Sequence, residues 1–500
     1  MKRRLPPALV IGAVALFRFS LMGRGAMAHL DETNYYKAVL ALGELRHGHL
    51  GTAILHMSSN SARPGLAVVQ LIPAALQGIP FAFGVSPSNP WSLLIPVTFN
   101  VIESLVALYM FWRISVLVFD GDETAATIAT GINGLLLNSN AYVRHLMAME
   151  PALALGLTAL WLALSREKTQ RLAFAIGALA LVTITVYPGY YLLAGLVCLA
   201  LAGSAGVDWM GRAKIGATAA AGAAVVLIST ELFCRIGGVS YVERMIWLGR
   251  RIDLGSFDEG WTFLPEYMLR VESFIGGVLL AGTAIYLLAF VAELSTKRRA
   301  RTIDWLVVPA IAAWIFQAVN AYYFRKIVFY GRLIHPWMPF MVWATIDIVR
   351  RVPWPAVRRA AYVTAAAASI GSWIAWAPSY LRLDYPPDVL YRLGINTALV
   401  PAAQRRCDME PWDVFRSPAP GNPRTGAPYT TRTDWMLVNF CVGAIDQTRP
   451  DFQADPPNLR LIYRGRHFIT FRGYEFENFT PKQRADLEQF PPDLRVYAPE

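Results

Sequence analysis

Two adjacent carboxylates, Asp31 and Glu32, follow the first apolar segment of the chain, within the stretch GAMAHLDETNYY that spans residues 25–36. A carboxylate near a membrane surface can act as a general base if its neighbours hold it ionised and close to a hydroxyl group. A divalent metal ion could also bind to this acidic pair. Taken alone, the pair equally fits two solvated acids of a loop.

A second group of candidate residues runs from Arg144 to Pro151, with the sequence RHLMAMEP. Glu150 stands at the start of a predicted apolar helix, where the helix dipole favours a carboxylate. A simple helix cap would therefore explain it, and a catalytic carboxylate would explain it too. Arg144 and His145 precede Glu150 by one to two helical turns, so they could pair with it or bind phosphate.

A third group, between residues 323 and 339, contains the cations Arg325, Lys326 and Arg332. The topology derived below places them outside the cytoplasm, where positive charge is disfavoured. An anionic ligand would explain them, and the planar fork of arginine suits phosphate. The alternative is that these side chains snorkel to the membrane interface. Arg63 is a weaker candidate for the same phosphate-binding role.

Composition identifies the class of protein that must position these residues. The 500-residue chain is 55% hydrophobic and only 16% charged, with a mean hydropathy of +0.37. Soluble proteins are nearer a quarter charged. Apolar runs recur from Leu5 to Pro378, which predicts a polytopic membrane protein. Ala26-Met27-Ala28 resembles a signal-peptide cleavage site, but a secreted protein would be polar beyond it, so we expect the first segment to be retained.

The basic residues, which give a net charge of +11, cluster in short loops between apolar segments. This is the bias of cytoplasmic loops in membrane proteins, and it argues against a nucleic-acid partner. Cytoplasmic loops are predicted at residues 2–4, 166–171, 212–214, 297–301 and 350–359. The N-terminus is then cytoplasmic, the C-terminal tail lies outside, and about eleven helices cross the membrane. These spans are predicted near Leu5–Met22, Trp91–Phe119, Thr124–Asn138, Glu150–Ser165, Leu172–Tyr187, Pro188–Ala205, Ile215–Cys234, Glu272–Leu294, Ile303–Asn320, His335–Val349 and Ala360–Pro378.

Residues 65–83 are apolar enough for a further span, but a crossing there would place every later basic loop outside. The segment also contains two prolines and two glycines. We therefore expect a segment that lies on the outer surface or is re-entrant, and the prolines and glycines favour a broken, interfacial helix.

The tail from residue 379 to residue 500 loses the long apolar runs and predicts a small soluble α/β domain. Strands are expected at residues 434–440, 459–463 and 468–471. Cys407 and Cys441 lie on the predicted oxidising side, which favours a disulfide between them; two buried free thiols are the alternative. Cys198 and Cys234 belong to spans and are predicted to be packing residues.

Taken in order, these features resemble the GT-C superfamily of integral-membrane glycosyltransferases, particularly bacterial relatives of protein mannosyltransferases and of the lipid A aminoarabinose transferase. The acidic pair with the nearby Tyr35 follows the first span, and an apolar interfacial stretch beginning at Arg63-Pro64 comes next. An Arg-x-x-x-x-x-Glu-Pro turn then opens a later helix at Arg144 to Pro151. Tyr330-Gly331-Arg332, with Pro336 and Pro339, is similar to the family's R-Y-x-x-P-x-x-P region with a changed order.

This resemblance implies a GT-C fold over residues 1–378, an outer catalytic loop at residues 24–90, and a donor sugar linked through phosphate to a polyprenol. It implies that Asp31 is the general base, that Glu32 supports it or binds a metal, and that the reaction inverts the anomeric centre. Arg325, Lys326 or Arg332 would stabilise the leaving phosphate. The acceptor would be a glycan, a lipid or a protein, and no cofactor beyond a possible divalent metal is required.

The same outer face carries the remaining candidates for substrate contact: Tyr35, Arg144, His145, Tyr190, Tyr330 and His335. A transporter or lipid flippase is the main alternative function. That class favours an internal repeat and ionisable residues near the bilayer midplane, and only Glu103 is an obvious case. A membrane scaffold, or a ligase that uses a sugar-diphosphate lipid, is a further alternative.

Overall fold

The computed structural model of the chain describes residues 6–26, 32, 34–59, 62–85, 90–165, 169–203, 208–253, 263–294, 301–324, 331–385, 388–389, 392–393, 413–416, 435–438, 459–466 and 493–499. All structural statements below refer to these residues.

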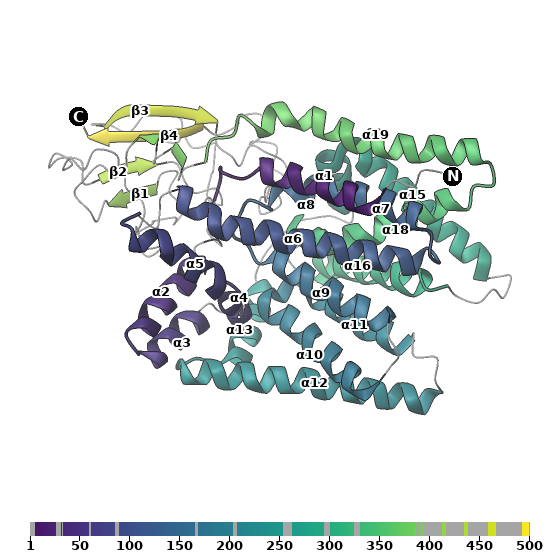
Figure 1. Cartoon of the computed structure of the whole chain (residues 1–500), viewed down its shortest axis with the longest axis horizontal. Coiled ribbons are helices and arrows are strands. Elements are labelled where there is room, and N and C mark those ends of the chain that lie inside the picture. The colour runs from purple at the N-terminus through teal and green to yellow at the C-terminus, as the bar shows by residue number, and fades with distance from the viewer. Residues whose placement is uncertain are drawn as a thin grey trace.

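The described chain is mostly helical, with a small sheet near its C-terminus (Figure 1). The first helices are α1 (Pro7–Ser20), α2 (Asn34–Arg46), α3 (Leu50–Ser58), α4 (Pro64–Val69), α5 (Leu71–Ala82), α6 (Pro90–Val118), α7 (Glu123–Gly134), α8 (Leu137–Ala141), α9 (Met149–Ser165) and α10 (Gln170–Val186). The next are η2 (Pro188–Tyr190), α11 (Tyr191–Gly203), α12 (Trp209–Ile236), α13 (Tyr241–Asp253), α14 (Phe263–Tyr267), η3 (Met268–Glu272), α15 (Ser273–Leu294), α16 (Asp304–Phe324), α17 (Gly331–Ile334), η4 (His335–Trp337), α18 (Met338–Arg350) and α19 (Pro355–Tyr380).

Each of the eleven predicted spans coincides with one helix of the structure, namely α1, α6, α7, α9, α10, α11, α12, α15, α16, α18 and α19. Four stretches are long and apolar enough to cross a membrane by themselves: Trp91–Val118, Trp209–Ile236, Leu264–Leu294 and Pro355–Tyr380. The other described apolar helices are shorter, so the number of crossings stays a prediction. Helix α19 ends at Tyr380, two residues beyond Pro378, the predicted end of the membrane region.

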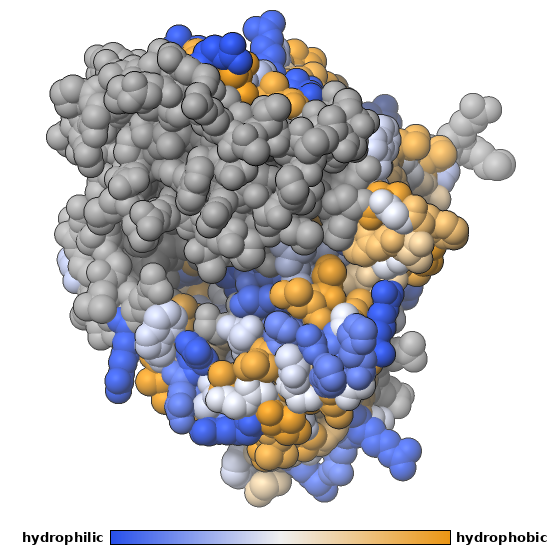
Figure 2. All heavy atoms as spheres, turned by 90° about the vertical axis from the view of Figure 1, so that its left-hand side faces the viewer, coloured by the Kyte–Doolittle hydropathy of each residue, from blue (hydrophilic) through white to orange (hydrophobic). Residues whose placement is uncertain are grey.

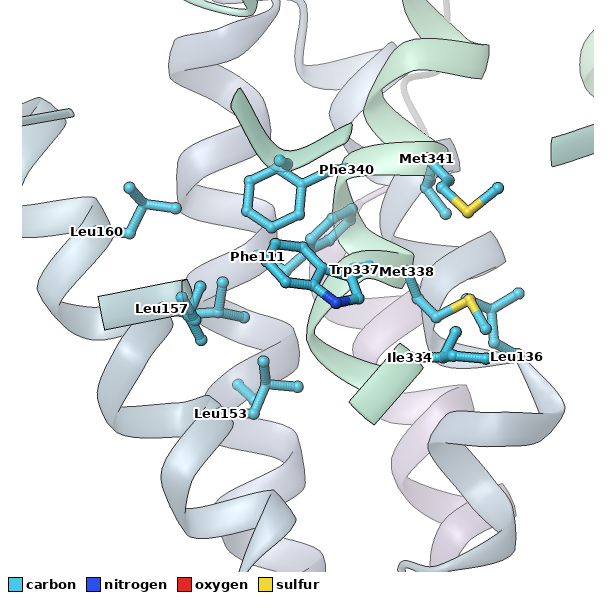
Figure 3. Close-up of a cluster of buried hydrophobic side chains, with 14 of the residues drawn as sticks. Phe111, Leu136, Leu153, Leu157, Leu160, Ile334, Trp337, Met338, Phe340 and Met341 are labelled. Carbon is cyan, nitrogen blue, oxygen red and sulfur yellow. The ribbon is translucent and has the colours of Figure 1, made fainter. Parts of the chain in front are cut away.

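The long helices form a bundle whose core is apolar. α6 packs on α7 and α9, α10 packs on α9 and α12, and α15 packs on α18 and α19. Figure 3 shows part of this core, where Phe111 of α6 and Leu157 of α9 meet Trp337 and Phe340. The ring of Trp343 stacks on Phe111 at a centroid distance of 5.0 Å, and its indole N–H donates to Ser115 Oγ at 2.7 Å.

Several of these helices also expose apolar side chains, which is typical of surfaces that face lipid rather than water. On α12 the exposed side chains include Ile228 and Leu232, and on α15 they include Leu288 and Val291. Such faces are consistent with a membrane protein. Cys234 of α12 is buried as predicted, whereas Cys198 lies exposed on α11, so the packing role predicted for Cys198 is wrong.

The segment 65–83 forms two short helices, α4 and α5, rather than one continuous helix. The chain turns at Gln70, and Pro80 lies inside α5. Ile72, Ile79 and Phe83 are exposed, while α5 packs on α2 and α6 through its other face. The broken, partly exposed helix predicted from the prolines and glycines is therefore present, although its position at a membrane surface stays a prediction.

Polar contacts gather the connecting segments at two ends of the bundle. At one end, Arg350 Nη2 donates to Phe119 O at 2.8 Å, Arg301 pairs with Asp347 at 3.0 Å, and Arg351 pairs with Glu293 at 2.6 Å. These residues flank the loops predicted to be cytoplasmic. At the other end, Arg18 of α1 donates to Asn140 of α8 at 3.1 Å, and Tyr190 of η2 lies 2.8 Å from His335 of η4. The first three contacts join residues in or beside segments predicted to be cytoplasmic, while the division of the remaining loops and the orientation in a membrane stay predictions.

The described strands of the tail form one antiparallel sheet in the order β1-β2-β4-β3. They are β1 (Asp413–Arg416), β2 (Trp435–Val438), β3 (Leu459–Arg466) and β4 (Asp493–Pro499). The strands predicted at residues 434–440 and 459–463 are confirmed, and the one at residues 468–471 lies outside the described residues. Asp384 N donates to Arg466 O at 2.8 Å, which ties β3 to the segment after α19.

Candidate active site

Glu32 is fully buried between the end of α1 and the loop that precedes α9. Its Oε1 accepts a hydrogen bond from the Leu146 N–H at 2.7 Å, and its Oε2 lies 3.2 Å from His145 Nδ1. Asn100 of α6 fixes the same loop, because its amide donates to the carbonyls of Val143 and His145, each at 2.8 Å. Glu32 directly follows the predicted base Asp31 in the sequence. These contacts anchor Glu32 to a segment more than a hundred residues further along the chain.

His145 is also fully buried, and burial lowers the pKa of its imidazole well below the ordinary value, assisted by the neighbouring Arg144 guanidinium. The ring is therefore neutral at pH 7. Arg144 in turn donates to the hydroxyl of Tyr385 and lies over the ring of Tyr380 at 4.1 Å. Since Arg is weakly hydrated and planar, aromatic rings can replace much of its water.

Glu150, at the start of α9, is buried and interacts electrostatically with Arg18 of α1. Arg18 is buried too, and its Nε donates to Asn140 Oδ1 at 3.1 Å. None of the described residues hydrogen-bonds Glu150 Oε1. The predicted pairing of Glu150 with Arg144 or His145 is not what the structure shows, because those two residues bond to Tyr385 and Glu32 instead.

Arg332 of α17 and His335 of η4 are buried as well. Tyr190 Oη lies 2.8 Å from His335 Nδ1, and Tyr190 is close enough to Glu150 and Arg332 for both charges to act on it. The residue before Arg332 is fixed by Asn138, whose amide donates to the Gly331 carbonyl at 3.0 Å.

Glu272 orders the chain around Asn138. Its two carboxylate oxygens accept the backbone N–H groups of Leu137 and Asn138 at 2.8 Å and 2.7 Å. These N–H groups open the short helix α8 and would otherwise lack partners, so the carboxylate acts as a helix cap.

Arg63 joins the same end of the bundle through aromatic contacts. Its guanidinium lies 5.0 Å from the centre of the Tyr187 ring, and Tyr187 packs edge-to-face on Tyr190 at 5.0 Å. Arg63, Tyr190, His335 and Arg332 therefore form a connected series from α4 to α17.

Tyr35 occupies a different environment from the other candidates. It is 0% exposed, and its hydroxyl donates to Gln77 Oε1 at 2.7 Å. This contact ties α2 to α5, so Tyr35 has a packing role, and its contacts do not support the predicted role in substrate binding.

Some predicted site residues lie outside the described part of the chain. They are Asp31, Arg325, Lys326 and Tyr330, together with both cysteines of the predicted disulfide, Cys407 and Cys441.

The acidic pair is also a candidate metal site, of which the structure describes Glu32 but not Asp31. Both oxygens of Glu32 face protein groups in a fully buried position. Among the described residues, no group of three or more Asp, Glu, His or Cys side chains could hold a metal ion.

Sequence reasoning missed several residues of this centre. Arg18 could have been found, because an arginine inside an apolar span is costly unless it is paired. Glu272 carries the same signal at the edge of its predicted span. Tyr385, and Asp388, which accepts the Gly25 N–H, carry no such sequence signal. They lie in a polar segment, and only the fold brings them to the site.

No family model matches this sequence, and no curated protein matches it. Among solved structures, the chain is similar to the crystal structure of the Archaeoglobus fulgidus oligosaccharyltransferase in complex with Zn and sulfate. The two share 14% sequence identity at a TM-score of 0.34, over 72% of this chain and 53% of the other. The aligned part thus spans about half of that protein, and a likeness of this size assigns neither a fold nor an activity.

Proposed function

We propose that this protein is a membrane glycosyltransferase that moves a sugar from a polyprenyl-phosphate donor to an acceptor hydroxyl at the extracytoplasmic face. One observation carries the proposal. Three separate regions that the sequence singles out, around Glu32, Arg144 to Glu150, and Arg332 to His335, meet in buried polar contacts at one end of an apolar helix bundle. A lipid-linked substrate presents its polar head at such a position.

In this proposal the acceptor hydroxyl loses its proton to the Asp31 carboxylate as its oxygen attacks the anomeric carbon. The bond from that carbon to the phosphate oxygen breaks, and polyprenyl phosphate leaves from the opposite face. One displacement inverts the anomeric centre, through a transition state with oxocarbenium character. Glu32, held by His145 and Leu146, positions the chain next to Asp31.

The leaving phosphate gains negative charge, so cations are needed beside it. Arg332 is buried in the centre, and Arg325 and Lys326 precede it in the sequence. A second group supports the same role near α4, where burial lowers the pKa of Lys37 and the charges of Arg244 and Arg63 lower it further. These three cations repel one another, and an anion bound between them would reduce that repulsion.

The proposal places the protein in a bacterial inner or plasma membrane as a multi-pass protein with a cytoplasmic N-terminus. The active site and the C-terminal domain, residues 379–500, then lie outside the cytoplasm. The exposed apolar faces of α12 and α15 support the membrane location, and the grouping of the loops at two ends supports the sidedness.

The role of Asp31 is tested by comparing Asp31→Asn with Glu44→Gln in the purified protein, supplied with a polyprenyl-phosphate sugar and an acceptor. Glu44 is a matched control, because it is an acid of the same predicted outer segment, and its Oε2 lies 2.9 Å from Nδ1 of the exposed His49 ring. We expect Asp31→Asn to lower kcat by roughly two to four orders of magnitude and Glu44→Gln to retain activity. Full activity of Asp31→Asn would remove the assigned base.

The buried pair Arg18 and Glu150 supports the alternative function of a transporter or flippase, because buried charges in membrane helices often mark a transport pathway. A flippase moves an unchanged lipid across the bilayer, whereas the proposed enzyme consumes it. Proteoliposomes that flip a labelled polyprenyl-phosphate sugar without releasing polyprenyl phosphate would favour the flippase.

A further inference from the structure

A cavity of about 230 Å³ lies beside the candidate active site, between the end of α1, the start of α6 and the segment that follows α19. The described residues that line it include Arg24, Trp91, Asp384, Tyr385, Asp388 and Arg392, and none of these is a candidate identified from the sequence. Figure 2 looks onto this end of the molecule, where hydrophilic side chains gather on part of the described surface.

The cavity adjoins the Glu32–His145 pair through a single aromatic ring. Tyr385 forms part of the lining, and its ring lies 5.9 Å from the ring of His145. Asp388 is fixed nearby, because its Oδ2 accepts the Gly25 N–H at 2.7 Å. Gly25 allows this close approach: its φ is +88°, and an added Cβ would lie 3.0 Å from the Tyr385 ring. A ligand in the cavity would therefore lie against Tyr385, whose ring neighbours His145, and His145 in turn contacts Glu32.

The lining combines an aromatic surface with charges that cancel. Trp91 is 72% exposed at the mouth, whereas Tyr385 is 1% exposed and forms the floor. The described lining contains two carboxylates, from Asp384 and Asp388, and two guanidinium groups, from Arg24 and Arg392; Arg392 Nη2 pairs with Asp384 Oδ1 at 2.9 Å, and the charges of both arginines act on Asp388. An anion would meet the two carboxylates, and a lipid chain would leave all four charged groups without water.

A sugar ring matches this combination. It has a C–H face that can stack on an indole, and hydroxyl groups that can bond to carboxylates and guanidinium groups. The volume lies below the ~300–1,000 Å³ of pockets that hold drug-sized ligands, which suits a single ring. The chemistry therefore favours an uncharged pyranose over a phosphate or an acyl chain.

We propose that this cavity binds a pyranose ring of the acceptor, so that the acceptor is a carbohydrate. The assignment of this sugar as the acceptor rests on the glycosyltransferase function proposed above. The position favours the acceptor over the donor sugar, because the base must touch the acceptor hydroxyl and Asp31 directly precedes Glu32. The candidate cations for the donor phosphate, Arg63 and Arg332, belong instead to the contacts around Tyr187 and Tyr190.

The site is tested without turnover by saturation-transfer NMR on the full-length protein in lipid nanodiscs, with no donor present. The probes are the methyl pyranosides of mannose, glucose, galactose and N-acetylglucosamine. At least one should bind the wild type with a Kd of ~1 mM. Trp91→Ala should weaken that binding roughly 5-fold.

Trp209→Ala is the matched control, because Trp209 is 73% exposed at the start of α12, away from the cavity, and its loss should leave binding unchanged. The inference is overturned if no methyl pyranoside binds, or if Trp91→Ala binds as tightly as the wild type. It is also overturned if transfer is active and Trp91→Ala leaves the KM for a glycan acceptor unchanged. Specific binding with no transfer from any polyprenyl-phosphate sugar keeps the site and removes the glycosyltransferase function, so the two failures are distinguishable.

Discussion

At the scale of single residues, the candidate site consists of buried charged side chains with partners from distant parts of the chain. Glu32 bonds to His145 and Leu146, and Arg144 lies between the rings of Tyr380 and Tyr385. Removing one partner of such a group would leave a buried charge uncompensated, which is strongly destabilising. Each of these residues is therefore held in position by the fold.

Asp388 gives a pH-dependent prediction at this scale. Burial raises the pKa of its carboxyl from 3.8 to about 6, although the Gly25 N–H and the nearby Arg144, Arg24 and Arg392 oppose that shift. The folded protein then binds this proton more tightly than the unfolded chain does. Stability from Asp388 is therefore present below about pH 4 and is lost as the pH rises to about 6.

The measurement compares thermal unfolding midpoints of the wild type and Asp388→Asn at one scan rate over this pH range. Asparagine can still accept the Gly25 N–H but does not titrate. The wild type should lose stability relative to the variant as the pH rises towards 6, with no further change above pH ~7. A constant difference, or a wild type that gains stability, would contradict the raised pKa.

The residue scale also shows what the sequence could and could not predict. Adjacent acids after the first span predict chemistry near Asp31, but nothing local distinguishes a solvated Glu32 from one that turns inward to a histidine 113 positions away. The sequence spacing allowed Glu150 to pair with Arg144 or His145, whereas in the fold the charge that acts on Glu150 is that of Arg18. Contacts of this kind depend on tertiary packing, which a single sequence does not contain.

At the scale of elements, helices α10 and α12 approach each other so closely that only glycine fits. A Cβ added to Gly222 would lie 2.0 Å from the carbonyl oxygen of Phe174, and one added to Gly177 would lie 1.9 Å from that of Ala219. Small residues at such crossings let two backbones meet, which is a common way to join membrane helices.

Gly222→Ala should therefore force α10 and α12 apart and lower stability by ~1–3 kcal/mol. Gly216→Ala is the matched control on the same helix, since an added Cβ there meets nothing within 4 Å. Alanine is favoured over glycine within a helix, so the control should be neutral or slightly stabilising. Thermal unfolding in one detergent compares the two variants, and equal midpoints would show that the helices do not pack this closely.

Helices of the apolar spans were predictable because length and hydropathy are properties of the local sequence. Their starts are marked as well: Asp122 and Asp208 accept the Ala125 and Gly211 N–H groups as helix caps. The helices α2, α3 and α13 were not predicted within the outer segments. Such short helices are stabilised by packing against neighbours, as α3 is by α2 and α12, rather than by a sequence signal of their own.

At the scale of the whole molecule, an apolar bundle of helices gathers polar groups at one end. The charge pattern of the loops predicts that grouping. Contacts such as those of Arg350 with Phe119 and of Tyr190 with His335 agree with it, and the sidedness stays a prediction. The cavity lined by Trp91 and Asp388 was beyond prediction, because it joins the start of α6 to a segment nearly three hundred residues later.

The central claim, transfer of a sugar from a polyprenyl-phosphate donor, is tested most directly with the purified wild-type protein in proteoliposomes. Two reactions are compared with the same glycan acceptor: one contains a polyprenyl-phosphate sugar, and the other contains the corresponding nucleotide sugar without a lipid carrier. Our account predicts a glycosylated product with inverted anomeric configuration, and free polyprenyl phosphate, from the first reaction alone. Product from the nucleotide sugar alone, or no product from any polyprenyl-phosphate sugar, would contradict it.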